Sequence, residues 1–446
     1  MQPVPSQIAG NDQPALVRSL GRWSLAALVL NGIIGTSVFI LPGTLGGRLG
    51  WMSLAAWGLA ALLSGSMILC FAEVSSRFSQ AGGAYLFTQA AFGPFVGLQV
   101  GWMSYFVRAV TSAVQANLFS TYLAEFWPWA STRSGGMATT GLFIGLLAAI
   151  NIRGVGSGAR VSNAFALIKI TPLLIFGAMG VIWIASGHEL PGHLPSDPSL
   201  GGWLRVLLLL MFAYGGFEAA LIPLAEAKNP QRDAPFALLL ALGTATLIYL
   251  LVQLAVLATV SEPQATDRPL AQSARTMFGA GGAALVILVA LISVYGWLAS
   301  NMLAVPRLSM AMAERGDFPA FFSRIHPAFR TPSTSILIFA GLTWGLANQA
   351  GLLQNLSLAA VVRLFTYGLV CAALPVLRRK HRLSDPTTEP HFRSPMGPLM
   401  ATVGVAVSVT LASRMSLRKA ITMGMVATLA TGYWFLRRSP SPSRRN

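Results

Sequence analysis

Twelve long apolar runs follow one another along the chain and constrain its fold more than any other feature. Most of the runs are close to the roughly 20 residues with which a helix crosses the hydrocarbon core of a bilayer. Only 10% of the 446 residues are charged, whereas a soluble domain carries roughly 25%. The chain is therefore predicted to be an all-α integral membrane protein. The runs lie at about 24–45, 51–75, 93–124, 138–152, 160–186, 203–226, 235–260, 281–313, 334–349, 354–377, 397–413 and 418–436.

The distribution of Lys and Arg predicts how these spans are oriented. With the N-terminus placed in the cytoplasm, the segments on the inner side hold 20 of the 31 basic residues and those on the outer side hold 8. Cytoplasmic loops carry such an excess of positive charge. The net charge of +17 is therefore interpreted as a topology signal rather than a nucleic-acid surface. Both termini are predicted to be cytoplasmic, and residues 1–23 contain no apolar segment of a cleaved signal peptide.

The sequence lacks the patterns typical of a membrane enzyme or an ATP-driven pump. It contains no HExxH motif, no GxxxxGK[ST] loop and no Cys/His spacing of a metal site. Cys70 and Cys371 both lie in apolar runs and are interpreted as core residues. His188 and His193 share one loop without a third ligand nearby. No enzymatic activity, cofactor or metal is predicted.

Two glycine-rich segments interrupt the first and sixth spans, at 31–38 and 212–218. Glycine tolerates unwound backbone and weakens a helix by about 1 kcal/mol relative to alanine. The two breaks open two blocks of five spans, and because five is odd, the second block must run inverted. Matched breaks in inverted halves are typical of transporters with a midplane site. A broken helix offers N–H groups to a carboxylate and C=O groups to an ammonium. The alternative is that the glycines only allow close helix packing.

Several segments, in their order and spacing, resemble the amino acid–polyamine–organocation (APC) transporters, in particular bacterial amino acid permeases. The resemblance extends over nearly the whole chain. The segments are Gly32–Thr36, Ala72–Glu73, Ala81–Tyr85, Ala91–Pro94, Phe212–Glu218, Lys228–Pro230, Pro306–Arg307 and Phe322–Pro327.

The resemblance implies an APC-like fold of 12 transmembrane helices, with ten in a 5+5 inverted repeat and two peripheral. The implied parts are a cytoplasmic segment 1–23, a first repeat 24–186, a second repeat 203–377, the last two helices 397–436 and a cytoplasmic tail 437–446. An inner (plasma) membrane location follows from the likeness to bacterial permeases.

The same resemblance implies the substrate contacts. Backbone groups of Ile34, Gly35, Thr36 and Ser37 would hold a substrate carboxylate. The second break, which comprises Phe212, Ala213, Tyr214, Gly215 and Gly216, would hold the substrate amine, with Phe212 as an aromatic gate. The family usually has glycine where this chain has Ser37, which adds a hydroxyl at that contact.

Ionisable residues inside spans are expensive, at about 2.5–3.5 kcal/mol each on insertion scales, so each one needs a reason. Lys169 in the fifth span matches the lysine that replaces a sodium ion in proton-coupled members of the family. Burial disfavours the charged form of a lysine, so Lys169 is a candidate proton carrier; the alternative is a structural or snorkelling lysine. Glu218 is a candidate proton sensor, or a residue that holds the unwound backbone.

Other polar residues are weaker candidates. Arg108 and Arg363 are interpreted as structural or cavity-lining residues, and Glu73 and Arg77 as gate or packing residues at the cytoplasmic interface. Side chains that remain open as pocket or gate residues are Tyr85, Gln115, Trp297 and Asn301, of which Asn301 is included among the substrate-binding candidates.

The sequence therefore favours a secondary active transporter of amino acids that works by alternating access with proton symport. The alternatives are an uncoupled exchanger of amino acids or polyamines and, with less support, a non-transporting membrane sensor. Phe212 and its small neighbours favour a neutral or apolar substrate.

Overall fold

The computed structural model describes residues 21–78, 82–153, 159–222, 224, 227–384 and 391–438. Within these ranges the chain forms α-helices and short 3-10 helices and no β-strand. Residues 1–20 of the expected N-terminal segment, Ala81 of the third family segment and the tail beyond residue 438 lie outside the described part.

The helices follow the predicted apolar runs, each of which contains one helix or one bent pair. Proline opens α5, α9 and α10, as expected for a residue without an N–H group to satisfy. The helices are α1 Arg22–Ile33, α2 Ser37–Leu49, α3 Met52–Ser75, α4 Gly83–Phe92, α5 Pro94–Leu123, α6 Arg133–Ile152, α7 Ala159–Ala185, α8 Leu200–Ala213, α9 Pro230–Thr259, α10 Pro269–Glu314, α11 Ser333–Gln349, α12 Leu352–Ser384, α13 Gly397–Ala412 and α14 Leu417–Arg438. The 3-10 helices are η1 Pro128–Ser131, η2 Phe217–Leu221, η4 Pro263–Ala265 and η5 Ala320–Ser323.

Seven helices of the described chain are long and apolar enough to cross a membrane, or up to nine if each of two bent pairs counts as one span. The bent pairs are α1 with α2, at 45°, and α13 with α14, at 117°.

Two features differ from the sequence expectation. Residues expected to be a loop before 93 form α4. The helix α10 begins 12 residues before the run at 281–313, with a non-helical residue at Gly279.

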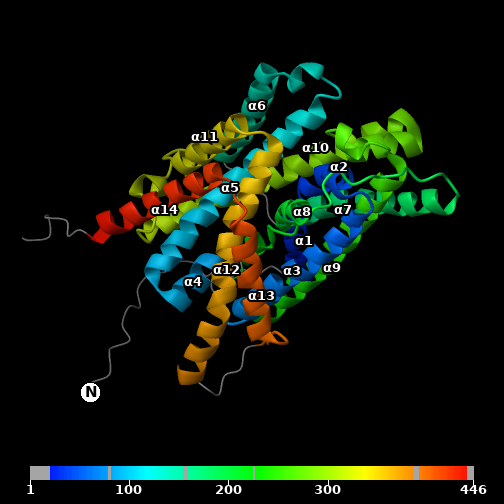
Figure 1. Cartoon of the computed structure of the whole chain (residues 1–446). Coiled ribbons are helices and arrows are strands. Elements are labelled where there is room, and N and C mark those ends of the chain that lie inside the picture. The colour runs from blue at the N-terminus through cyan, green and yellow to red at the C-terminus, as the bar shows by residue number, and fades with distance from the viewer. Residues whose placement is uncertain are drawn as a thin grey trace, which may run out of the picture.

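The two interrupted helices lie deep in the bundle. α1 packs against α7 and α9, whereas α8 packs against α3 and α12. Figure 1 shows α7 and α9 on one side of α1 and α8, α5 and α12 on the other, and α3, which contacts both α9 and α12, below them. The residues that surround the two breaks are therefore brought from helices far apart in the sequence.

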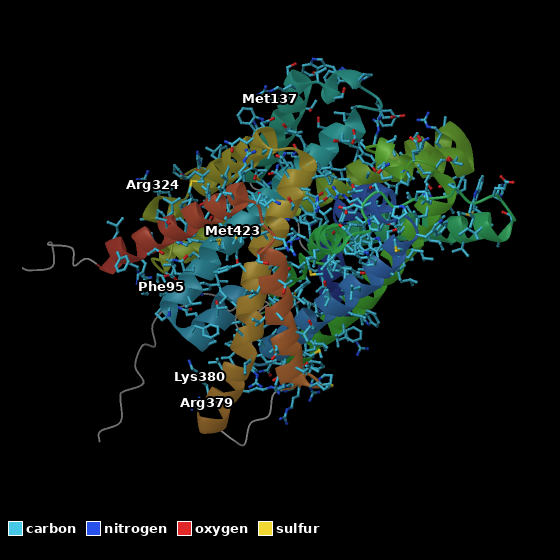
Figure 2. The ribbon with its side chains drawn as sticks, in the orientation of Figure 1. Phe95, Met137, Arg324, Arg379, Lys380 and Met423 are labelled. Atoms are coloured by element: carbon cyan, nitrogen blue, oxygen red, sulfur yellow. The ribbon has the colours of Figure 1, made fainter. Side chains whose placement is uncertain are left out.

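The outside of the bundle is largely apolar, as a lipid-facing surface requires. Leu62 and Leu142 are more than 70% exposed. Basic residues gather at the end of α12, where Lys380 donates to the carbonyls of Ala90 and Ala91. Figure 2 shows Arg379 and Lys380 at the opposite end of the molecule from Met137 of α6. Cys70 and Cys371 are buried free thiols, as the sequence predicted.

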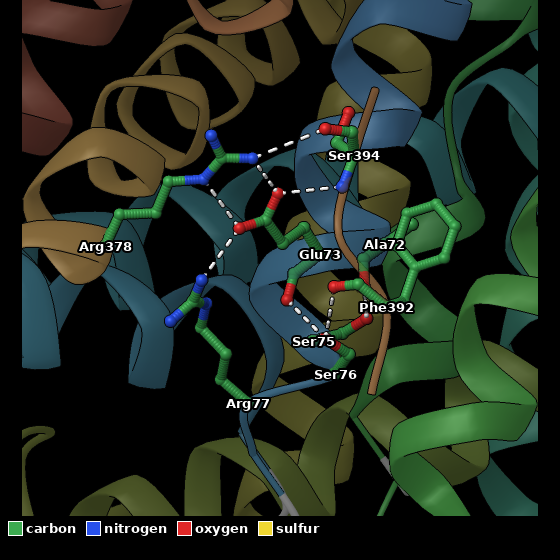
Figure 3. A network of polar contacts seen from close by, with 8 residues as sticks. All are labelled: Ala72, Glu73, Ser75, Ser76, Arg77, Arg378, Phe392 and Ser394. Carbon is green, nitrogen blue, oxygen red and sulfur yellow. Dashed lines mark hydrogen bonds and ion pairs between the residues drawn. The ribbon is translucent and has the colours of Figure 1, made fainter. Parts of the chain in front are cut away.

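A buried carboxylate joins the end of α3 to the end of α12 (Figure 3). Glu73, which has no exposed surface, accepts from Arg77 at 2.7 Å and from Arg378 at 2.8 and 2.5 Å. The backbone N–H of Ser394, in the segment that leads to α13, donates to the same carboxylate at 2.9 Å. One acidic residue therefore connects three segments at this end of the bundle.

Candidate functional site

The first break separates α1 from α2. The helix α1 ends at Ile33, and Ile34 has ψ 87°, outside the helical region. Helix α2 begins at Ser37, so its first N–H groups have no partner within the helix. Thr36 and Ser37 are buried, and the hydroxyl of Thr36 has no hydrogen-bond partner among the described residues. This end of α2 offers donors and a positive dipole end to an anion.

The second break follows the end of α8 at Ala213. Gly216 has φ +102°, a backbone conformation that glycine adopts readily, and the 3-10 helix η2 starts at the next residue. Both breaks therefore form where the sequence predicted them.

The two breaks touch each other through their backbones. A Cβ atom built on Gly32 would lie 2.7 Å from the carbonyl oxygen of Gly216, and a Cβ atom on Gly216 would collide with the carbonyl of Gly32. The glycines are required for this close approach as well as for unwound backbone. The close packing considered for the glycines is therefore found at the breaks themselves.

Lys169 of α7 points into the first break. Its ammonium donates to the carbonyl of Ile34 at 2.8 Å and to that of Asn31 at 3.4 Å. The side chain is 1% exposed, so it does not snorkel to the interface. The structure thus places the predicted proton-carrier candidate directly on the backbone of α1.

Tyr249 of α9 connects the two breaks. Its hydroxyl lies 3.0 Å from the carbonyl oxygen of Ile33 and 2.9 Å from that of Ala213. A hydroxyl has one hydrogen, so the two carbonyls share it. The same oxygen is 3.5 Å from the hydroxyl of Ser37. Sequence reasoning missed this residue; the available signal was the one tyrosine of the seventh run.

Glu218 holds the unwound backbone after α8. Its Oε2 accepts from the N–H of Gly216 at 2.9 Å and from the hydroxyl of Tyr367 at 2.5 Å. Its Oε1 lies 3.4 Å from Nη2 of Arg108 and 3.7 Å from Nε of Arg363. Tyr367 of α12 is a second residue that the sequence analysis did not select.

Arg363 of α12 occupies the space beside Gly215. It donates to the carbonyl of Phe212 at 3.2 Å and to the hydroxyl of Thr111 at 3.3 Å. Its guanidinium also lies 4.9 Å from the centre of the Phe212 ring, in a cation–π arrangement. A side chain on Gly215 would collide with Arg363. Arg363, for which a cavity-lining role was considered, therefore lies at the second break itself.

The place where the two breaks touch, at Gly32 and Gly216, is called the crossing below. The remaining predicted side chains lie at different distances from it. Gln115 of α5 would contact a Cβ atom on Gly35 at 3.0 Å. Tyr85 donates to Asp317 near the end of α10. Asn301 donates to the carbonyl of Trp297 on its own helix at 3.2 Å, and no hydrogen bond within the described ranges joins it to either break.

A cavity of about 30 Å³ lies next to the second break, between α4, α5, α10 and α12. Arg108, Glu218, Arg363 and Tyr367 line it from the side of the crossing, and Tyr85 from α4. Among the described residues, no three His, Cys, Asp or Glu side chains are grouped to hold a metal ion. The site is therefore a cluster of charged and aromatic side chains around two buried, unwound stretches of backbone.

Comparison with known proteins supports the family resemblance of the sequence along nearly the whole chain. The sequence profile of the amino acid permease family matches residues 20–434. The chain is 26% identical to the methylthioribose transporter of Bacillus subtilis (strain 168), with 91% of this chain and 90% of that protein covered. It is 27% identical to the serine/threonine exchanger SteT of the same organism, with 88% and 90% covered. The branched-chain amino acid permease BcaP, also from that organism, is 26% identical, with 96% and 93% covered.

Proposed function

The chain belongs to the amino acid permease family, and from this premise we propose that it is a proton-coupled secondary transporter of amino acids. It works by alternating access in the plasma membrane, with both termini in the cytoplasm. The proposed architecture has 12 spans, of which ten form a 5+5 inverted repeat within 24–186 and 203–377. The helices at 397–436 are peripheral.

The substrate binds where the two breaks cross. Backbone groups of Ile34, Gly35, Thr36 and Ser37, between α1 and the first residue of α2, receive its carboxylate. The unwound stretch from Phe212 to Gly216 receives its amine, and Phe212 closes the site. These roles are supported by the buried backbone contact between Gly32 and Gly216, which brings both ends of a zwitterion's site together.

The observation that carries proton coupling is the contact of Lys169 with α1. The charged ammonium makes a charge-assisted hydrogen bond to Ile34, stronger than the bond a neutral amine would make. Loss of the proton would loosen Lys169 from the first break and so change the backbone that binds the carboxylate. Glu218 fixes the second break through Gly216 and is the second proton-sensitive candidate.

A second candidate function is obligate exchange without a coupling ion. It is favoured by the similarity to a serine/threonine exchanger. In that case Lys169 stays charged throughout and only braces the break.

Uptake of labelled amino acids into proteoliposomes tests the proposal. With an inward proton gradient, the natural protein is expected to accumulate substrate several-fold more than without it. Lys169→Ala should lose that stimulation, whereas the exposed Lys228→Ala control should keep it. Uptake that needs only amino acid preloaded inside, and ignores the gradient, would instead establish the exchanger.

A further inference from the structure

The buried charges beside the second break do not balance. Arg108, Arg363 and Glu218 are 4%, 3% and 8% exposed. Within the described residues, Glu218 is the acidic side chain within salt-bridge distance of either arginine, and one of its oxygens serves both. Two buried guanidinium ions facing one carboxylate leave an uncompensated positive charge, which is costly in a low-dielectric interior.

Glu218 does not correct this, because it carries one negative charge for two guanidinium ions. Its Oε1 faces both arginines, while its Oε2 accepts from Tyr367 and from the backbone of Gly216. The second oxygen therefore stabilises the unwound backbone rather than a cation.

The arginines, by contrast, have donors to spare. A guanidinium carries five N–H donors. In the described structure Nε of Arg363 has no hydrogen-bond partner although it is buried. Arg108 makes one hydrogen bond there, to Glu218 at 3.4 Å. Both side chains line the same cavity of about 30 Å³, so a ligand that widens this cavity would meet both guanidinium groups.

Five backbone carbonyls at the two breaks already accept a hydrogen bond from a side chain. Arg363 binds the carbonyl of Phe212, Tyr249 binds those of Ile33 and Ala213, and Lys169 binds those of Asn31 and Ile34. The cavity therefore has two cationic side chains with unused donors beside one carboxylate, and several nearby backbone carbonyls already have a donor. Such a lining is complementary to a ligand richer in negative than in positive charge.

We propose that the substrate is an amino acid with an acidic side chain, whose second carboxylate binds between Arg108 and Arg363. The planar guanidinium matches a carboxylate in bidentate geometry. This assignment rests on the proposed transport function and specifies its substrate class. It also replaces the neutral substrate suggested by Phe212 and its small neighbours, because the sequence did not reveal that α5 and α12 bring two arginines to the same place.

The test uses isosteric pairs that differ in charge. Uptake of L-glutamate and L-aspartate into proteoliposomes is compared with that of L-glutamine and L-asparagine, at equal and sub-saturating concentrations. The natural protein should favour each acid over its amide at least tenfold. Repeating the assay with chloride replaced by gluconate separates a substrate carboxylate from an inorganic anion at the arginines, and the preference should not change.

Variants locate the preference. Arg363→Gln and Arg108→Gln should each bring the acid-to-amide ratio close to one, whereas the exposed Arg414→Gln control should keep the ratio of the natural protein. If a glutamine variant does not fold, the ratio measured for the natural protein alone still decides. If amides or other neutral amino acids are taken up as well as the acids, this inference is wrong, but the proposed amino acid transport is still supported. Failure of all acids and neutral amino acids to be taken up would overturn the proposed function itself.

Discussion

At the scale of single residues, side chains from scaffold helices satisfy the backbone that the two breaks expose. Ile33 and Ala213 lie about 180 residues apart in sequence, yet one hydroxyl, that of Tyr249, serves both of their carbonyls. A buried carbonyl without a donor costs about 1–3 kcal/mol. Tyr249, which is fully buried, therefore stabilises both unwound segments.

Tyr249→Phe removes this hydroxyl and keeps the ring. It is expected to lower stability by about 1–3 kcal/mol, because a buried carbonyl loses its donor, and to reduce uptake strongly because both breaks are at the site. Thermal unfolding in detergent and liposome uptake measure the two effects. The matched control is Tyr433→Phe in α14, whose hydroxyl donates to the carbonyls of Gly316 and Phe318 away from the breaks; it should lower stability with a much smaller effect on uptake. Equal losses of uptake in both variants would contradict a specific role for Tyr249.

At the scale of elements, the site is the crossing of two interrupted helices. The glycines near the middle of the first and sixth runs predicted both interruptions, and the structure has them at these positions. The direct contact between the two backbones was not predictable from either segment, since it depends on how α1 and α8 pack. The same holds for Arg363, whose place beside Gly215 is set by the packing of α12 on α8.

Gly216→Ala tests this crossing. The added methyl group would collide with the carbonyl of Gly32, and alanine at φ +102° costs about 1–3 kcal/mol in backbone strain. Uptake should fall at least tenfold and the unfolding temperature should drop. Gly243→Ala in α9, where the methyl group meets open space, should leave both unchanged. A Gly216→Ala protein with normal uptake would show that the backbones do not need to touch.

At the scale of the whole molecule, the sequence predicted an all-helical membrane protein and the order of its helices. Composition was sufficient for this, because apolar runs of spanning length have few alternatives to a helix in lipid. Sequence reasoning missed α4, whose 10 residues are too few to cross a membrane, and the early start of α10. It also placed Glu73 and Arg77 at an interface without identifying Arg378 as the partner, because that residue is about 300 positions away.

The network of Glu73 holds one end of the bundle together, and Glu73→Gln tests its contribution. The change leaves Arg77 and Arg378 without their buried counter-ion (Figure 3), which typically costs about 3–5 kcal/mol. The unfolding temperature should therefore fall clearly. The exposed Glu262→Gln is the charge-matched control and should unfold like the natural protein. An unchanged unfolding temperature for Glu73→Gln would mean that the three segments are held together by packing alone.

The occupied carbonyls at the crossing make ligand binding a replacement reaction. An ammonium group that takes over the hydrogen bond at the oxygen of Phe212 or Ile34 displaces Arg363 or Lys169 from it. The measured affinity is then the difference in free energy between the carbonyl bound to the side-chain cation and the carbonyl bound to the ligand. The affinity is higher if the displaced cation forms a new interaction with another group. For Arg363 this new partner would be a carboxylate of the same ligand. The ligand's carboxylate would then compensate for the hydrogen bond to Phe212 that its ammonium group replaces.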